Sequence, residues 1–394
     1  MIGALEFAAT SAGLAAGLFA LGRREAGGLE RARAAVPIRI HVNGMRGKSS
    51  TVRLIAAGLF EAGIPALAKA TGTAPRVLAP DEEAEIARGA RPNIIEQADF
   101  LRHAAAEGAR AVVIECMALR PDFQSVCELS IIRSTHGVIT NAGPDHLDVM
   151  GPAVEDVARA LAGTVPVNGR LFTSESPGLT VFREAARDRG SSVVVVGERE
   201  IANVSVAGFP HREHPVNVAL ALAVLADLGI PRETALRGFA QKLHPDPGAT
   251  TVHTIRHNGA RVTFVNAFGA NDRVSSGIAW RSALRDFPDT RWKMIVISCR
   301  HDRPARTADL ADAAHGWPRA DRYAAIGPDA RRFLSLAARA GWPCVGVPYG
   351  TPAATWPDRV MDGLVGDGLI VGLGNSAGGG LDFAAAIAAR EVER

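Results

Sequence analysis

Short apolar runs alternate with longer stretches of helical spacing along most of the chain. Ile38, Ile40 and Val42 are separated by single polar residues, which is the pattern of a β-strand. In the next stretch, 49–62, apolar residues recur every three or four positions, as in an amphipathic helix. The same order recurs, with strands expected at 111–114, 137–140 and 193–196, and helices at 96–107, 154–161 and 214–228. Strands that alternate with helices predict an α/β fold whose mostly parallel sheet is covered on both faces.

A second set of strands follows a break in this pattern. The break is the segment Leu243–Thr250 (LHPDPGAT), where prolines and a glycine interrupt the periodicity. Beyond it, strands are expected at 262–265, 294–297, 324–326, 344–347 and 369–371. We therefore predict a central domain over residues 36–245 and a smaller, Rossmann-like C-terminal α/β domain over 246–394.

The N-terminus has a different pattern. The segment Ile2–Leu21 carries Glu6 as its only charge and is long enough for a helix to span about 30 Å, roughly one bilayer core. Arg23 and Arg24 follow it, and no basic residue precedes it. The positive-inside rule then predicts a single-pass membrane anchor, with an anchor-and-linker segment over residues 1–35 and a cytoplasmic catalytic body. The alternative is a buried helix rich in alanine and glycine.

Composition and charge narrow the class of protein. Hydrophobic residues make up 47% of the chain and charged residues 22%, as in a globular protein with a large core. The net charge of +3 over 394 residues gives no electrostatic footprint for nucleic acid, so we expect no nucleic-acid partner. The four cysteines form no C-x-x-C pair, which favours reduced thiols over a disulfide framework or a zinc site.

The segment Gly44–Ser50 (GMRGKSS) lies where a phosphate-binding loop must be, between a strand and a helix. Glycines allow backbone N–H groups to turn inward, the helix N-terminus attracts anions, a lysine can reach the β- and γ-phosphates, and a serine hydroxyl can bind Mg²⁺. The loop is shorter than the usual pattern, so a plain structural turn is the alternative. We expect the nucleotide to contact Gly44, Met45, Arg46, Gly47, Lys48, Ser49 and Ser50.

Two more polar groups follow predicted strands of the same sheet. Glu115 ends the apolar run 111–114, and Asn141, Asp145 and His146 follow the strand at 137–140. Because the carboxyl ends of parallel strands meet at one edge of a sheet, these groups are candidates for Mg²⁺ binding beside the loop. Taken singly, Glu115 would be read as a solvent-facing strand end and Asp145-His146 as a capping pair.

These motifs together resemble the Mur ligase superfamily of ATP-dependent amide ligases. The matching residues are the loop GMRGKSS, Thr71-Gly72-Thr73, Glu115 after its strand, TNAGPDHLD at Thr140–Asp148, HPVN at His214–Asn217, NAFGAND at Asn266–Asp272 and VGLGN at Val371–Asn375. The resemblance runs from about residue 36 to the C-terminus. Within the superfamily the chain is most similar to the ligase subunits of poly-γ-glutamate synthases.

The resemblance implies an acid–amino-acid ligase that uses ATP and Mg²⁺. It would join glutamate units through γ-carboxylates by way of an acyl phosphate, with glutamate and the growing chain as substrates. It implies catalytic roles for Lys48, Glu115 and His146, metal binding by Ser49, Glu115 and His146, and nucleotide contacts from Asn217 and Asn266. It also implies partner subunits for synthesis or export at the membrane, while a homo-oligomer remains open.

Two departures from the family pattern leave alternatives open. No lysine lies between Asp145 and Gly169, where Mur ligases usually carry a modified lysine, and Ala249 stands where a linker arginine is common. Arg46, Arg300 or Arg303 could supply the missing positive charge, although surface ion pairs are the ordinary interpretation of the last two. The alternatives are another Mur-type ligase, such as one similar to folylpolyglutamate synthase, and a non-ligase nucleotide-binding scaffold of a membrane complex.

Overall fold

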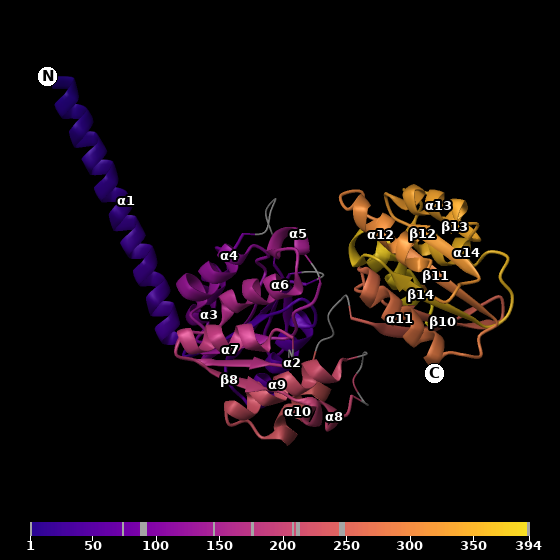
Figure 1. Ribbon diagram of the computed structural model, residues 1–394, viewed down its shortest axis with the longest axis horizontal. Coiled ribbons are helices and arrows are strands. Elements are labelled where there is room, and N and C mark those ends of the chain that lie inside the picture. Colours follow the sequence, from indigo (N-terminus) through magenta and orange to yellow (C-terminus); the bar gives the residue numbers. More distant parts are fainter. Residues whose placement is uncertain are drawn as a thin grey trace. The chain divides into compact units, whose positions relative to one another are not determined.

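The computed structural model describes residues 2–72, 75–86, 93–144, 146–174, 177–206, 209, 213–243 and 249–391. At positions 2, 4–6 and 8 it describes the backbone alone. The chain divides into two compact units (Figure 1); of the described residues, those up to 243 belong to unit 1 and those from 249 to 391 belong to unit 2. The predicted boundaries at residues 35/36 and 245/246 stay predictions.

The described part of unit 1 contains an eight-stranded sheet with the order β4-β3-β2-β5-β1-β6-β7-β8. Strands β2 and β5–β8 run parallel with β1, while β3 and β4 add an antiparallel edge. The strand bounds are β1 (Ile38–Asn43), β2 (Ala66–Ala70), β3 (Arg76–Leu78), β4 (Glu83–Glu85), β5 (Ala111–Glu115), β6 (His136–Ile139), β7 (Arg170–Thr173) and β8 (Ser192–Val195).

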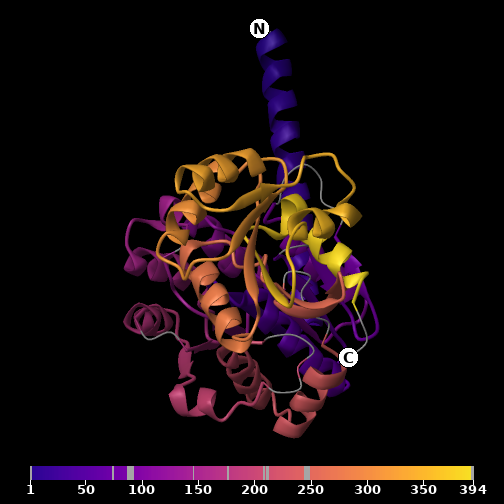
Figure 2. The same ribbon diagram turned by 90° about the vertical axis from the view of Figure 1, so that its right-hand side faces the viewer.

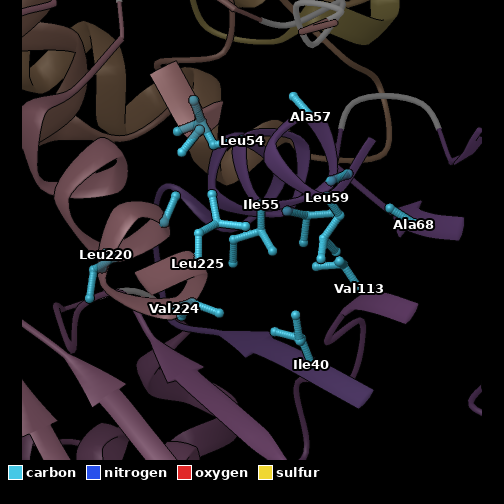
Figure 3. Packing of buried hydrophobic residues seen from close by; sticks show 14 of the residues in the cluster. Ile40, Leu54, Ile55, Ala57, Leu59, Ala68, Val113, Leu220, Val224 and Leu225 are labelled. Carbon is cyan, nitrogen blue, oxygen red and sulfur yellow. The ribbon is translucent and has the colours of Figure 1, made fainter. Parts of the chain in front are cut away.

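Helices cover both faces of this sheet because successive strand residues point to opposite sides. Ile40 of β1 and Val113 of β5 pack with Leu54 and Leu225 on one face (Figure 3). That face is covered by α2 (Lys48–Glu61), α9 (Pro215–Asp227) and α10 (Arg232–Gln241). The other face carries α3 (Glu96–Ala106), α4 (Pro121–Val126), the π-helix η1 (Cys127–Ile132), α6 (Val154–Leu161) and α7 (Leu179–Asp188). The short helices α5 (Leu147–Met150), η2 (Ala162–Thr164) and α8 (Glu198–Ala202) complete unit 1 as described.

The first helix, α1 (Ile2–Ala35), is longer than the sequence pattern predicts. The expected polar linker continues the helix, because residues 22–35 are rich in helix-forming Ala, Arg, Glu and Leu. Its last turns pack on α3 and η1 through Ala32, and Leu14 and Phe19 further back are exposed.

The structure gives no membrane-spanning helix over Ile2–Leu21 among the residues that it describes. Within the ranges that the structure describes, α1 included, no helix is both long and apolar enough to cross a membrane. The side chains at positions 2, 4–6 and 8 lie outside those ranges, and the remainder of the span is short, rich in Ala and Gly, and followed directly by Arg23 and Arg24. The predicted single-pass membrane localisation therefore stays a prediction.

Unit 2 is a second α/β layer structure (Figure 2). The order of the sheet over residues 249–391 is β13-β12-β11-β14-β10-β9, parallel except for the β9–β10 hairpin. Strand bounds are β9 (Thr251–His257), β10 (Ala260–Asn266), β11 (Trp292–Ser298), β12 (Arg322–Ile326), β13 (Cys344–Gly346) and β14 (Gly368–Leu373). The helices are α11 (Arg273–Asp286), α12 (Pro304–Ala314), α13 (Ala330–Arg339), η3 (Ala353–Thr355), α14 (Trp356–Met361), η4 (Ser376–Gly380) and α15 (Leu381–Ala388). Two apolar clusters, one on each face of the sheet, form its core.

Candidate functional site

The loop between β1 and α2 has the backbone of a tight cradle. Gly44 has φ 130° and Gly47 has φ 81°, a region that side-chain-bearing residues rarely adopt. A Cβ on Gly44 would lie 2.0 Å from Thr140 Oγ1, so glycine is required there for space as well as for conformation. Lys48, Ser49 and Ser50 form the first turn of α2 and follow the left-handed Gly47 at its N-cap. The N-terminus of α2 therefore opens at the carboxyl end of β1, which favours anion binding.

The side chain of Asn141 clasps the middle of this loop. Its Oδ1 accepts from the Arg46 N–H at 3.0 Å, and its Nδ2 donates to the Arg46 carbonyl at 2.9 Å. Thr140 Oγ1 donates to the same carbonyl at 2.6 Å, and the Met45 N–H donates to the Asn141 carbonyl at 3.1 Å. The sequence predicts Asn141 as a candidate group of the metal site; in the structure its side chain is hydrogen-bonded to the backbone of Arg46 in the loop.

Ser49 and Glu115 meet as the sequence predicted. The Ser49 hydroxyl donates to Glu115 Oε2 at 2.9 Å, and the Thr71 N–H donates to the same oxygen at 2.7 Å. Glu115 is only 2% exposed, and Gln97 Nε2 donates to its backbone carbonyl at 3.0 Å. Strands β1 and β5 are neighbours in parallel register, which brings the end of β5 beside the first turn of α2. A hydroxyl and a carboxylate are thus fixed side by side at the sheet edge.

The Lys48 side chain lies back over the loop. Its Nζ donates to the Gly44 carbonyl at 2.7 Å and contacts the Met45 carbonyl at 3.4 Å. These neutral carbonyls hold the ammonium close to the backbone N–H groups of the cradle without neutralising its charge. The positive charge is therefore available to phosphate oxygens that enter the loop.

Asn217 lies against the cradle from the first turn of α9. A Cβ on Gly47 would come within 2.3 Å of Asn217 Oδ1, so the amide sits directly over the glycine. Asn217 Nδ2 donates to Glu213 Oε1 at 2.9 Å, and both side chains are buried. The contact places Asn217 at the loop, while its predicted role toward adenine or ribose stays a prediction.

Two other predicted site residues are not brought to this cluster by the described contacts. His146 precedes α5 with φ 53°, and its neighbour Asp145 lies outside the described residues. Asn266 ends β10 in unit 2, where its Oδ1 accepts from the Phe268 N–H at 3.5 Å. The metal role of His146 and the nucleotide contact of Asn266 stay predictions.

Of the alternative arginines, Arg300 is already paired. Its guanidinium holds Asp302 through two hydrogen bonds, at 2.9 and 2.7 Å, and this contact with Arg300 lowers the pKa of Asp302 to about 2. This geometry agrees with the ordinary interpretation of Arg300 as a member of a surface ion pair.

A buried ion pair supports β1 directly beneath the cradle. His41 Nδ1 lies 2.8 Å from Glu128 Oε2, and Glu128 Oε1 accepts from the N–H and the hydroxyl of Ser134. Burial alone would lower the pKa of His41, but Cys116 and Glu128 outweigh it and raise the pKa to about 9. The His41 Nε2 atom makes no hydrogen bond of acceptable geometry, so we assign the stabilisation of the imidazolium mainly to the carboxylate of Glu128.

Sequence patterns gave no signal for this support. His41 is one polar position in an alternating strand, and Glu128 lies 87 residues away in an unusual π-helix. Gln97, which holds the backbone of Glu115, reads as an ordinary polar residue of α3. Only the register of β1 against β5, together with the packing of α3 and η1, brings these groups together.

The donor atoms at the cradle suit a divalent cation that arrives with a nucleotide. Among the residues that the structure describes, no three His, Cys, Asp or Glu side chains form a metal cluster. Mg²⁺, however, is often held by one or two protein oxygens, with waters and phosphate oxygens completing its shell. Ser49 Oγ and Glu115 Oε2, 2.9 Å apart, provide such a pair.

Comparison with protein families gives two matches along the chain. Residues 42–219 match the Mur ligase middle domain, and residues 252–390 match the C-terminal domain of the poly-gamma-glutamate synthase CapB. Over 296 residues the chain is 40% identical to the capsule biosynthesis protein CapB of Bacillus anthracis, covering 74% of this chain and 63% of that protein. It is 35% identical to the PGA synthase CapB of Bacillus subtilis (strain 168), covering 74% and 75% respectively. The chain thus spans just under two thirds of the length of the first relative.

Solved structures with the same fold include Escherichia coli FolC in complex with DHPP and ADP. It superposes with a TM-score of 0.64 at 17% identity, over 93% of this chain and 91% of that one. MurF from Acinetobacter baumannii gives a TM-score of 0.61 at 16% identity, over 94% and 80%. At this level of sequence identity, the structural similarity establishes the α/β fold with parallel sheets and does not establish the activity.

Proposed function

Because the chain belongs to the CapB family of poly-γ-glutamate synthases, with a Mur ligase middle domain, we propose that it is an ATP-dependent ligase that joins glutamate units through their γ-carboxylates. The structural observation that carries the proposal is the pairing of Ser49 with Glu115 beside the Gly44–Ser50 loop at one edge of the parallel sheet. Family membership agrees with the resemblance noted in the sequence.

In the proposed reaction a γ-carboxylate takes the γ-phosphoryl group of ATP, giving an acyl phosphate and ADP. An amine of a second glutamate unit then attacks the acyl carbon and releases phosphate. The first step brings two anions together, so positioning and charge neutralisation dominate the barrier. The inward backbone N–H groups of the cradle and the Lys48 ammonium are the groups in unit 1 that would stabilise the phosphates.

The nucleotide would bind with a divalent cation at Ser49 and Glu115. The related structures include a Yersinia pestis folylpolyglutamate synthase/dihydrofolate synthase complexed with AMPPNP and a manganese ion, which supports ATP and a divalent metal here, with Mg²⁺ as the proposed ion. Bound there, the cation would offset phosphate charge. The Thr71 N–H and the Gln97 amide keep Glu115 in place and aimed at the loop.

Replacing the cradle lysine tests the proposal directly. Lys48→Ala should abolish ATP-dependent formation of γ-glutamyl bonds while leaving the fold intact, since Nζ bonds only to loop carbonyls in the described structure. Lys242→Ala is the matched control, because that lysine makes one surface contact, to Asp81 at 3.5 Å. Product is measured with labelled L- and D-glutamate and resolved by size. Full activity in Lys48→Ala would remove the cradle from the mechanism.

The two other candidate functions are separated by substrate. A folylpolyglutamate synthase-like ligase would release phosphate from ATP faster with a folate than with glutamate alone. A non-ligase scaffold would bind or hydrolyse ATP and form no amide bond with either substrate. We expect stimulation by glutamate and its oligomers, in line with the match of residues 252–390 to the CapB C-terminal domain.

A further inference from the structure

A cavity of about 420 Å³ opens at the opposite end of the unit 1 sheet from the cradle. Arg39 is the second residue of β1, Thr135 directly precedes β6, and Asn168 lies just before β7. The cavity is therefore at the amino ends of these strands. Along β1, Arg39 in the cavity is separated from Gly44 of the cradle by about 17 Å, at the usual rise of a strand. Its lining residues are Arg39, Glu128, Leu129, Arg133, Ser134, Thr135, Val167 and Asn168.

Two guanidinium groups give this cavity its chemistry. Arg39 Nε donates to the carbonyls of Ile132 and Arg133, and its Nη1 donates to those of Arg33, Val36 and Pro37. These bonds fix the group, yet its Nη2 donates to no described residue and is not sealed from solvent. Arg133 Nε bonds the Leu129 carbonyl, and its Nη2 likewise has no partner in the described structure. One N–H₂ group on the fixed guanidinium of Arg39 and one on the exposed guanidinium of Arg133 are therefore left for a ligand.

The local charge balance is positive. Burial, followed by the neighbouring Arg33, lowers the pKa of Arg39. Glu30 offsets part of this positive charge, because its carboxylate forms ion pairs with Arg33 at 2.6 Å and with Arg133 at 3.5 Å. Glu128, which is held by His41 and Ser134, also faces Arg39 and raises its pKa, so Arg33, Arg39 and Arg133 are opposed by the two carboxylates of Glu30 and Glu128. An added oxyanion would relieve the repulsion among the three arginines, and the planar guanidinium matches a carboxylate in particular.

We propose that this cavity is an oxyanion site that takes a carboxylate of a γ-linked glutamate chain. The identity of the chain rests on the proposed function, whereas the oxyanion chemistry rests on the cavity alone. A polymer made at the carboxyl edge of the sheet bears one carboxylate per unit, so a second contact on the far side of unit 1 would retain it between additions. Inorganic phosphate shares the chemistry and is the competing source of ligand.

The test measures binding of a fluorescent γ-glutamyl oligomer to full-length protein that carries Lys48→Ala, which removes turnover. Arg133→Gln in this background should weaken the oligomer about tenfold, the usual effect of losing one charge-assisted hydrogen bond. Arg187→Gln is the control, because Arg187 is an exposed arginine whose one ion pair, with Asp188, is 4.0 Å long. Asn168→Asp is a second variant, since aspartate tolerates the φ of 53° at that position and adds a repelling charge.

Equal oligomer affinity in Arg133→Gln and Arg187→Gln would overturn the proposal. If phosphate binds with the same dependence on Arg133 and the oligomer does not, the cavity is an oxyanion site for phosphate and the polymer assignment is wrong. An absence of γ-glutamyl product from the wild-type enzyme, with Arg133-dependent phosphate binding intact, would count against the proposed function and leave the oxyanion site standing.

Discussion

Gly47→Ala offers the sharpest test of the cradle geometry. Gly47 has φ 81°, and forcing a side-chain-bearing residue into this left-handed region costs about 1–2 kcal/mol. The new Cβ would also lie 2.3 Å from Asn217 Oδ1, so the amide must move. Moving it breaks the buried bond from Asn217 to Glu213, worth about 1 kcal/mol. The expected loss in the free energy of unfolding of unit 1 is therefore about 2–3 kcal/mol.

Gly63→Ala is the matched control for strain without collision. Gly63 has φ 69° and no atom within 4 Å of the position of a new Cβ. Because only backbone strain is introduced, the free energy of unfolding of Gly63→Ala should fall by about 1–2 kcal/mol, and the variant should bind ATP as the wild type does. The melting temperature of unit 1, followed by differential scanning fluorimetry, should fall by about 2–4 °C per kcal/mol in each variant. The difference between the two variants isolates the contact with Asn217.

Binding of a fluorescent ATP analogue measures the consequence for function. We expect Gly47→Ala to weaken it at least about tenfold, or ~1.4 kcal/mol, because displacement of the loop misdirects its N–H groups. The double variant Gly47→Ala/Asn217→Ala should be about as stable as Gly47→Ala, since the bond from Asn217 to Glu213 is already broken in the single variant. If Gly47→Ala matches Gly63→Ala in both stability and affinity, the inferred packing of α9 on the loop is wrong.

Two further predictions concern the carboxylate and the buried histidine. Glu115→Gln keeps the shape of the side chain, so the protein should still fold, while ATP-dependent ligation should fall by a factor on the order of 10². Added Mg²⁺ should not restore the rate. A wild-type rate in a steady-state assay would contradict the role of Glu115. The raised pKa of His41, about 9, predicts stability that is complete below pH 6.5 and declines as pH rises toward 9, with a slope of up to about 1.4 kcal/mol per pH unit. Urea unfolding across this range should show the decline in the wild type and not in His41→Gln; parallel curves would refute the assignment.

The parallel core of each unit could be predicted because its strands are short apolar runs between helices. The expected strands at 38–42, 111–114 and 369–371 are confirmed as parts of β1, β5 and β14. Strands β2, β3 and β4, which were not predicted, lack this signal. Strand β2 (ALAKA) is rich in alanine and contains Lys69, which is buried because Gln97 and Glu96 accept its hydrogen bonds. The antiparallel strands β3 and β4 have three residues each, too few for a period to show.

The site could be predicted as far as local chain order determines it. The end of β5 and the first turn of α2 must share a sheet edge once β1 and β5 are neighbours, so the meeting of Ser49 with Glu115 followed from the motif order. The hydrogen bonds between the Asn141 side chain and the Arg46 backbone could not be predicted, because an asparagine after a strand is equally suited to binding a metal or to holding a turn. The membrane anchor predicted at Ile2–Leu21 stays a prediction, because five side chains of that span lie outside the described residues and the rest forms no helix long and apolar enough to cross a membrane.

The cradle depends on segments that carry none of its motif residues. β1 presents Ile40 and Val42 to the core under α2, while His41 faces η1 and is fixed there by Glu128. Asn43, at the last position of β1, donates to Gln124 of α4 and to Thr164 and accepts from the Gly44 N–H, so the loop leaves the strand from an anchored point. A loop whose glycines permit many conformations needs such fixed ends, because each disordered residue would cost about 1–2 kcal/mol of entropy when phosphate binds. The polar residues on the second face of β1 therefore preorganise the phosphate site from beneath, and substitutions at Glu128 or Gln124 should weaken ATP binding without touching the nucleotide.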